Sequence, residues 1–168
     1  ALMELLVDSL EKELPTLQEN KIRLQTIGNA SSLPERCRKK LEETMRLTNQ
    51  NTGLTLTLAL SYSGRWEITD AVKKIASDIL EGKLKPEQVN EDVISSRLST
   101  SGMPDPELMI RTGGEMRISN FLLWQLAYAE LFITRKFWPD FRKEDLFEAI
   151  VAYQQRERRF GKVLEPQA

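Results

Sequence analysis

The sequence predicts an α/β protein with a mostly parallel β-sheet and helices on both faces. Helical and strand-like segments alternate along all 168 residues, and this alternation favours parallel strands joined by helical crossovers. The segment LTLTLAL (54–60) is the clearest strand pattern in the chain. No internal repeat, low-complexity tract or linker interrupts the sequence, so we expect a single domain over 1–168.

The composition excludes several classes of protein. Cys37 is the only cysteine, and the sequence contains no histidine. An intrachain disulfide, a zinc site of the Cys/His type and any His-dependent catalytic scheme are therefore excluded. A lone cysteine fits a reducing compartment, and we expect a cytoplasmic protein. The net charge of -1 gives no support to nucleic-acid binding, and no apolar run reaches membrane-spanning length.

The first part of the chain is predicted to contain two helices and two strands. Leucines at helical spacing predict an amphipathic helix over 1–19. IRLQTI (22–27) alternates like a strand, and the capping-box pattern at 32–35 predicts a helix that continues to about residue 48. The apolar stripe of this helix comprises Cys37, Leu41 and Met45. LTLTLAL (54–60) then supplies the second strand.

The rest of the chain continues the alternation. Apolar residues from Ile68 to Ile79 mark a helix, and Pro86 is predicted to open another. LMIRT (108–112) reads as a short buried strand. The next four expectations are a central buried helix over 121–131, a last strand over 132–135, an N-cap at Asp140 and a final helix over about 142–160.

The segment RTGGEMRISN (111–120) lies where a parallel sheet normally binds its ligand. It begins at the end of the strand at 108–112, and ligands of open α/β sheets bind beyond the carboxyl ends of the strands. Gly113 and Gly114 allow a sharp turn and a close approach of the backbone to a ligand. This position therefore favours a binding loop.

The side chains of this segment indicate an anionic ligand. Arg111 and Arg117 supply planar guanidiniums that suit diphosphate oxygens, and Ser119 supplies a hydroxyl group. A helix beginning near Asn120 would add free N–H groups at its positive end. We therefore predict a diphosphate site. The alternative is that both arginines are ordinary surface residues and Ser119 is a helix cap.

Two long blocks of sequence resemble one enzyme family. RTGGEMRISNFLLWQLAYAELF, followed by WPDF and RERRFG, resembles the C-terminal signature of the cis-prenyltransferases. NTGLTLTLALSYSGRWEI is similar to a second block of that family, and the resemblance extends over essentially all 168 residues. The greatest similarity is to the bacterial isoprenyl transferases, which implies the family fold without its first strand or strands.

The family resemblance implies a reaction and its partners. Cis-prenyltransferases condense isopentenyl diphosphate repeatedly onto an allylic prenyl diphosphate. In the bacterial members this is farnesyl diphosphate, and the product is a long cis-polyprenyl (undecaprenyl) diphosphate for the lipid carrier of cell-wall synthesis. They use Mg2+ and work as homodimers. For this chain the resemblance therefore implies a transferase with Mg2+ as cofactor, a second copy as partner, and at most peripheral membrane contact through the lipid product.

The resemblance also implies roles for individual residues of the loop. Arg111, Arg117 and Ser119 would hold the diphosphate of isopentenyl diphosphate, with the backbone of Ile118 between them. Glu115 would orient the two arginines.

Three further residues have implied roles. Glu130 would be the Mg2+ carboxylate, and Arg159 and Gly161 of the R-x-G motif would complete the site of the partner subunit. On the predicted helix, Glu130 would lie roughly 16 Å from Ser119, so we expect it to act across a dimer interface. The alternatives are that Glu130 only pairs with a neighbouring arginine and that RERRF is a solvated helix end.

The sequence also departs from the family pattern. The D-G-N-G-R-W and S-x-E-N-W motifs do not occur in it, and Met116 stands where many bacterial members have a histidine. Because the family's Mg2+-binding aspartate belongs to the first of these motifs, we assign no catalytic residue. We expect a C-terminal portion of such an enzyme, unable to turn over by itself. The alternative is a non-catalytic, diphosphate-binding or dimerising subunit or fragment of the same family.

Overall fold

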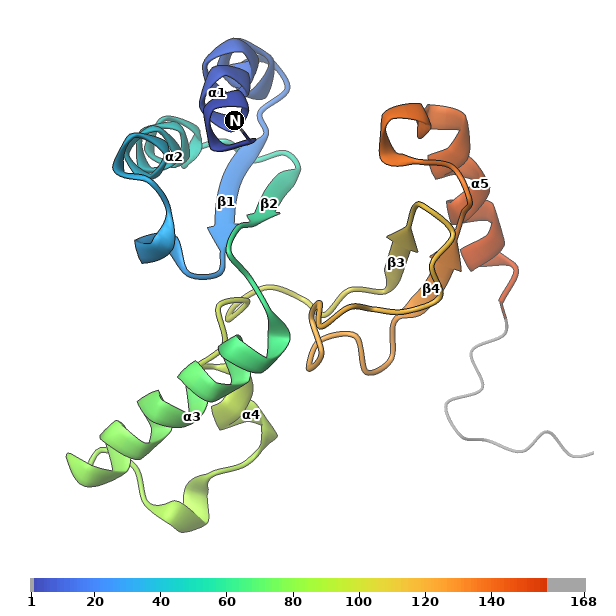
Figure 1. The fold of residues 1–168 in the computed structure, drawn as a ribbon. Helices are drawn as coiled ribbons and strands as arrows, with labels where there is room; N and C mark the ends of the chain where they lie inside the picture. The colour runs from blue at the N-terminus through green and yellow to red at the C-terminus, as the bar shows by residue number, and fades with distance from the viewer. Residues whose placement is uncertain (1, 157–168) are drawn as a thin grey trace, which may run out of the picture. The chain divides into compact units, whose positions relative to one another are not determined.

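The computed structural model describes residues 2–156, which belong to two compact units, Ala1–Met103 and Pro104–Ala168. Each unit contains one pair of parallel strands with helices beside it (Figure 1). The predicted fold class, α/β with parallel strands and helices, is therefore confirmed. That residues 1–168 form a single domain stays a prediction.

The first unit begins with two helices and two strands in alternation. The elements are α1 (Leu2–Glu19), β1 (Arg23–Ile27), α2 (Glu35–Thr48) and β2 (Thr55–Ala59), close to the predicted bounds. The strands pair in parallel with Leu24 opposite Leu56. The predicted capping box is wrong, because the hydroxyl group of Ser32 donates to the Asn29 carbonyl at 2.8 Å within a short turn, and Pro34 precedes α2 instead.

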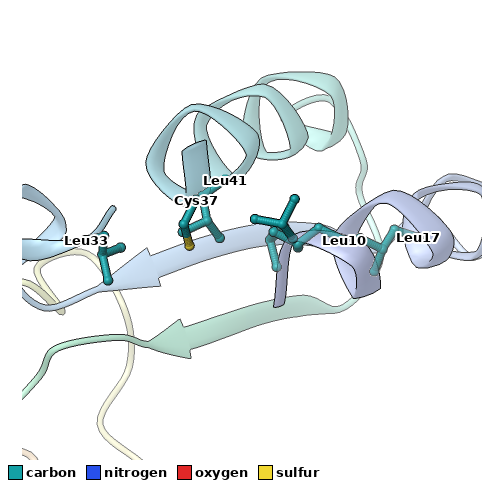
Figure 2. Packing of buried hydrophobic residues seen from close by; sticks show 7 residues of the cluster. Leu10, Leu17, Leu33, Cys37 and Leu41 are labelled. Carbon is teal, nitrogen blue, oxygen red and sulfur yellow. The ribbon is translucent and has the colours of Figure 1, made fainter. Parts of the chain in front are cut away.

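The core of this unit lies where α1 and α2 pack together against β1. Its buried side chains are those of Val7, Leu10, Leu17, Leu24, Leu33, Cys37 and Leu41. Figure 2 shows side chains from both helices meeting over the strand. The predicted stripe of α2 is confirmed, with Met45 packed partly against this cluster. Each fully buried leucine stabilises the fold by about 1.5–3 kcal/mol.

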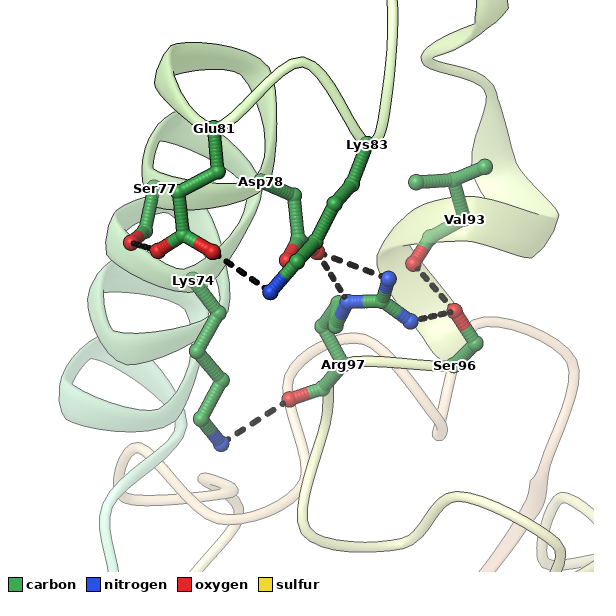
Figure 3. A network of polar contacts seen from close by, with 8 residues as sticks. All are labelled: Lys74, Ser77, Asp78, Glu81, Lys83, Val93, Ser96 and Arg97. Carbon is green, nitrogen blue, oxygen red and sulfur yellow. Dashed lines mark hydrogen bonds and ion pairs between the residues drawn. The ribbon is translucent and has the colours of Figure 1, made fainter.

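The remainder of the first unit is helical. It comprises α3 (Gly64–Leu80), a 3-10 turn at Pro86–Gln88 and the short α4 (Glu91–Ser95). A continuous helix from Pro86 was a wrong prediction, because Asn90 caps a new helix by accepting from the Val93 amide at 3.0 Å. Arg97, which follows α4, donates to Asp78 of α3 at 2.9 and 2.7 Å and so ties the two segments together (Figure 3).

The second unit is built around one strand pair. It contains β3 (Leu108–Arg111), β4 (Glu130–Ile133), a 3-10 turn at Trp138–Asp140 and α5 (Lys143–Gln154). The strands are parallel, with Leu108 opposite Glu130 and Arg111 opposite Ile133. The predicted N-cap at Asp140 is wrong, since Arg142 precedes α5 and its amide donates to Asp145 at 2.8 Å.

The predicted helix over 121–131 does not form. The segment runs through turns, and Ser119, Asn120 and Leu122 have φ angles of 47°, 63° and 45°. Such left-handed backbone is incompatible with a right-handed helix. The last strand also starts earlier than predicted, because Glu130–Ile133 pairs with β3 and removes the end of the predicted helix.

Candidate functional site

The loop that follows β3 turns sharply at its two glycines. Gly113 and Gly114 have φ angles of 87° and 75°, which only glycine adopts without strain. Their amides donate to the carbonyls of Lys136 and Thr134, each at 2.8 Å. The predicted turn is therefore confirmed. These two N–H groups face the segment after β4, so an anion must rely on other donors.

The side chain of Arg111 contacts three other residues of the loop. Its guanidinium donates to the Arg117 carbonyl, to the Ser119 hydroxyl oxygen at 3.1 Å and to the Glu115 carboxylate at 2.9 Å. These contacts span residues 111–119. One arginine side chain therefore fixes the curvature of the whole loop.

The Glu115 carboxylate lies between two guanidiniums. The same oxygen that accepts from Arg111 pairs with Arg117 at 2.5 Å. The side chain of Arg111 is 21% exposed and that of Arg117 is 68% exposed. The loop thus presents one anchored and one accessible cation, with an internal carboxylate shared between them.

The end of the loop differs from the prediction. No helix begins at Asn120, so the prediction that free N–H groups of a helix start bind the anion is wrong. The Ile118 carbonyl instead accepts from the Phe121 amide at 3.0 Å in a turn. Ser119 keeps its predicted place beside Arg111. Because its oxygen accepts from the guanidinium, its own O–H proton can point toward a ligand.

The structure brings Arg111, Glu115, Arg117 and Ser119 together at the carboxyl end of β3. Two guanidiniums and a hydroxyl group in one loop can bind a diphosphate through charge-assisted hydrogen bonds. The nearby Met116 side chain is 87% exposed and offers a thioether, which is a poor ligand for a hard cation. These side chains make the loop a candidate site for an anion rather than for a cation.

Glu130 lies at the other end of the strand pair. It is opposite Leu108, whereas Arg111 is opposite Ile133, so about three steps of roughly 3.3 Å separate the two ends along the strands. Glu130 forms an ion pair with Arg156, whose guanidinium also donates to the Leu131 carbonyl at 2.8 Å. Glu130 begins a strand and does not lie on the predicted helix. As predicted, however, it lies away from the loop of its own chain.

No group of three or more His, Cys, Asp or Glu side chains within residues 2–156 is placed to hold a metal ion. Glu130 offers one hard oxygen ligand, but the described side chains alone do not complete a Mg2+ site. Arg159 and Gly161 lie outside the described residues.

Sequence reasoning missed Lys136, which contacts the back of the loop, and its partner Asp145. Lys136 accepts from the Gly113 amide through its carbonyl, and its ammonium group pairs with Asp145 of α5. Asp145 is 6% exposed. The pair raises the pKa of Lys136 and lowers the pKa of Asp145, to which the Arg142 amide also donates. The signal available in the sequence was an aspartate near the start of a predicted helix.

Parallel strand pairs with helices beside them, and an arginine-lined loop at the end of β3, are the features to compare with known proteins. The family model described as "Putative undecaprenyl diphosphate synthase" matches residues 1–161. The chain belongs to this prenyltransferase family. None of the helices in the described part of the chain is long and apolar enough to cross a membrane.

Curated relatives carry enzyme names of the same family. The chain is 53% identical over 165 residues to an isoprenyl transferase from Chlorobaculum tepidum, covering 98% of this chain and 62% of that protein. It is 46% identical over 160 residues to a ditrans,polycis-undecaprenyl-diphosphate synthase ((2E,6E)-farnesyl-diphosphate specific) from Aliivibrio fischeri, covering 95% and 62%. The chain thus spans 62% of the length of each of these relatives.

Two solved structures resemble the chain closely. A lavandulyl diphosphate synthase from Lavandula x intermedia, in complex with dimethylallyl diphosphate, matches with a TM-score of 0.93 and 36% identity, covering 96% of this chain and 70% of that one. A probable undecaprenyl diphosphate synthase from Campylobacter jejuni matches with a TM-score of 0.80 and 35% identity, covering 95% and 72%. Both support the prenyltransferase fold.

Proposed function

We propose that this chain carries the isopentenyl diphosphate site of a cis-prenyltransferase that extends farnesyl diphosphate to a long cis-polyprenyl diphosphate. The observation that carries the proposal is the cluster of Arg111, Arg117 and Ser119 at the carboxyl end of β3. Glu115 joins the two arginines, and Arg111 donates to Ser119. The family membership and the names of the relatives support the reaction class.

The proposed roles follow from the geometry of each side chain. Arg111 holds the inner part of the diphosphate and the shape of the loop, because its guanidinium already bridges three loop residues. Arg117, the more exposed cation, meets the ligand first. The hydroxyl group of Ser119 donates a hydrogen bond to a diphosphate oxygen. The backbone of Ile118 lies between Arg117 and Ser119. Glu115 orients both guanidiniums.

Mg2+ is the proposed cofactor, and Glu130 is its proposed protein ligand. The ion would neutralise part of the negative charge on the diphosphates. Because Glu130 pairs with Arg156 and lies at the far end of the strands, we propose that it serves the site of a second copy. A cytoplasmic homodimer, with Arg159 and Gly161 completing the partner's site, is the assembly that this arrangement suits.

Binding of isopentenyl diphosphate by the 168-residue chain tests the proposal. Calorimetry should give a measurable affinity that Arg117→Ala weakens and that Lys83→Ala, which removes an exposed cation paired with Glu81 in the first unit, leaves unchanged. Equal affinities for wild type and Arg117→Ala would sink the site assignment. Light scattering with isopentenyl diphosphate and Mg2+ tests the homodimer.

The enzyme and subunit alternatives differ in turnover. We expect no polyprenyl product when the 168-residue chain is incubated with farnesyl diphosphate, isopentenyl diphosphate and Mg2+. Product formation would contradict that expectation and favour a self-sufficient transferase. Binding without product would favour a diphosphate-binding portion or subunit of the enzyme.

A further inference from the structure

The back of the diphosphate loop rests on the segment that follows β4. The Thr134 amide donates to the Arg111 carbonyl at 2.9 Å, and the Gly113 and Gly114 amides donate to the Lys136 and Thr134 carbonyls at 2.8 Å. Arg111 and the glycines therefore keep their positions only while residues 134–136 keep theirs. The placement of this segment decides where the Arg111 guanidinium lies.

The segment is held in turn by one ion pair to α5. The Lys136 ammonium group meets the carboxylate of Asp145, whose side chain is 8% exposed. The second oxygen of Asp145 accepts from the Arg142 amide at 2.8 Å, which fixes the carboxylate at the start of α5. Lys136 thus links α5 to the loop. Its ammonium group pairs with Asp145 of α5, and its carbonyl accepts from the Gly113 amide.

We propose that Lys136 and Asp145 are positioning residues for the diphosphate site, acting on Arg111 through the hydrogen bond from the Gly113 amide to the Lys136 carbonyl. This inference rests on the proposed function of the loop. Neither side chain touches the ligand. The pair acts by holding the loop in the conformation that presents the guanidinium. The directions of the two pKa shifts agree with a pair that stays charged near neutral pH.

The test separates charge pairing from helix capping and from general stability. Asp145→Asn keeps an oxygen that can accept from the Arg142 amide but loses the charge, and Lys136→Met removes the ammonium group while keeping most of the side-chain length. Lys136→Arg retains a cation and serves as the conservative rescue. Asp78→Asn is the matched control, because it breaks a comparable aspartate pair with Arg97 in the first unit.

Isopentenyl diphosphate and inorganic diphosphate are titrated into each variant of the 168-residue chain by calorimetry, and melting temperatures are recorded alongside. We expect Lys136→Met and Asp145→Asn each to weaken binding about three- to tenfold. The double variant should be no weaker than either single one, since both act through one contact. Lys136→Arg should stay within about twofold of wild type, and Asp78→Asn should bind like wild type.

Wild-type affinity in both single variants, with binding lost in Arg111→Ala, overturns the positioning role and leaves the site intact. Additive losses in the double variant also overturn it. Wild-type affinity in Arg111→Ala instead overturns the proposed site itself. If Asp145→Asn does not fold, the comparison of Lys136→Met with Lys136→Arg decides the same question, with equal affinities counting against the proposal.

Discussion

Replacement of Arg111 by alanine removes the side chain that organises the diphosphate loop. In the folded chain this guanidinium bridges the Arg117 carbonyl, the Ser119 hydroxyl oxygen and the Glu115 carboxylate. A bound diphosphate would share or replace the last of these contacts. In the proposed function, the substitution removes a direct contact with the ligand and also frees the loop.

The size of the loss follows from the number of charge-assisted bonds. A hydrogen bond to a charged group contributes about 1.5–3 kcal/mol, so the loss of one such bond and some loop order should cost about 2–3 kcal/mol, roughly a 30- to 150-fold weaker Kd for isopentenyl diphosphate. Arg111→Lys should recover only part of this, because an ammonium group lacks the planar fork that spans two acceptors.

Calorimetry at two salt concentrations provides the assay. The affinity of the wild type should fall as salt rises, since charges near the surface are screened. Arg97→Ala is the control, because Arg97 pairs with Asp78 in the first unit and its loss removes the same positive charge. A Kd for Arg111→Ala within about threefold of the wild type, with Arg97→Ala equally unchanged, would refute the reasoning.

Three further predictions concern the fold and the loop. Leu41→Ala, in the core of the first unit, should lower the free energy of unfolding in urea by about 2–5 kcal/mol, and a loss below about 1 kcal/mol would contradict its place in the core. Lys136 lowers the pKa of Asp145, so this carboxylate stabilises the fold at neutral pH, and the contribution is lost as acid titrates it below the ordinary aspartate range. Asp145→Asn should therefore flatten the acid limb of thermal stability against pH, and an unaltered limb argues against the pair. Gly114→Ala places a side chain at a φ of 75° and should cost about 1–2 kcal/mol and weaken diphosphate binding, whereas a neutral result would show that the turn is not required.

Local pattern was enough to predict the first two helices and both strands of the first unit. Regular spacing of leucines gave α1, the alternation in 22–27 and 54–60 gave both strands, and the burial of Cys37 and Leu41 confirmed the stripe of α2. In each of these elements the apolar residues recur at the spacing of a helix or a strand. They therefore lie on one face, and burial of that face stabilises the element. The spacing of apolar residues therefore predicts a helix or strand correctly where the locally favoured element is also the one that buries those residues.

The second unit was harder to predict because its order comes from distant pairing. FLLWQLAYAEL is mostly apolar and favours a helix locally. Glu130–Ile133 nevertheless pairs with β3 as a parallel strand, although residues 112–129 separate the two strands in the sequence. The left-handed backbone at Ser119 and Asn120 also has no strong local signal. The residues of the loop were nevertheless chosen correctly as neighbours, since the glycines and arginines follow directly on a predicted strand. Their role in binding a diphosphate stays a prediction.

The position of Glu115 has a consequence for how the loop selects its ligand. Two guanidiniums share one carboxylate, so the free loop carries its own counter-ion and only one net positive charge. An anion with fewer charges than a diphosphate would have to displace or share this counter-ion for a smaller electrostatic gain. A ligand with several negative charges close together can engage both cations while Glu115 keeps one of its contacts. Discrimination between a diphosphate and a monophosphate would then arise from the built-in carboxylate as much as from the arginines.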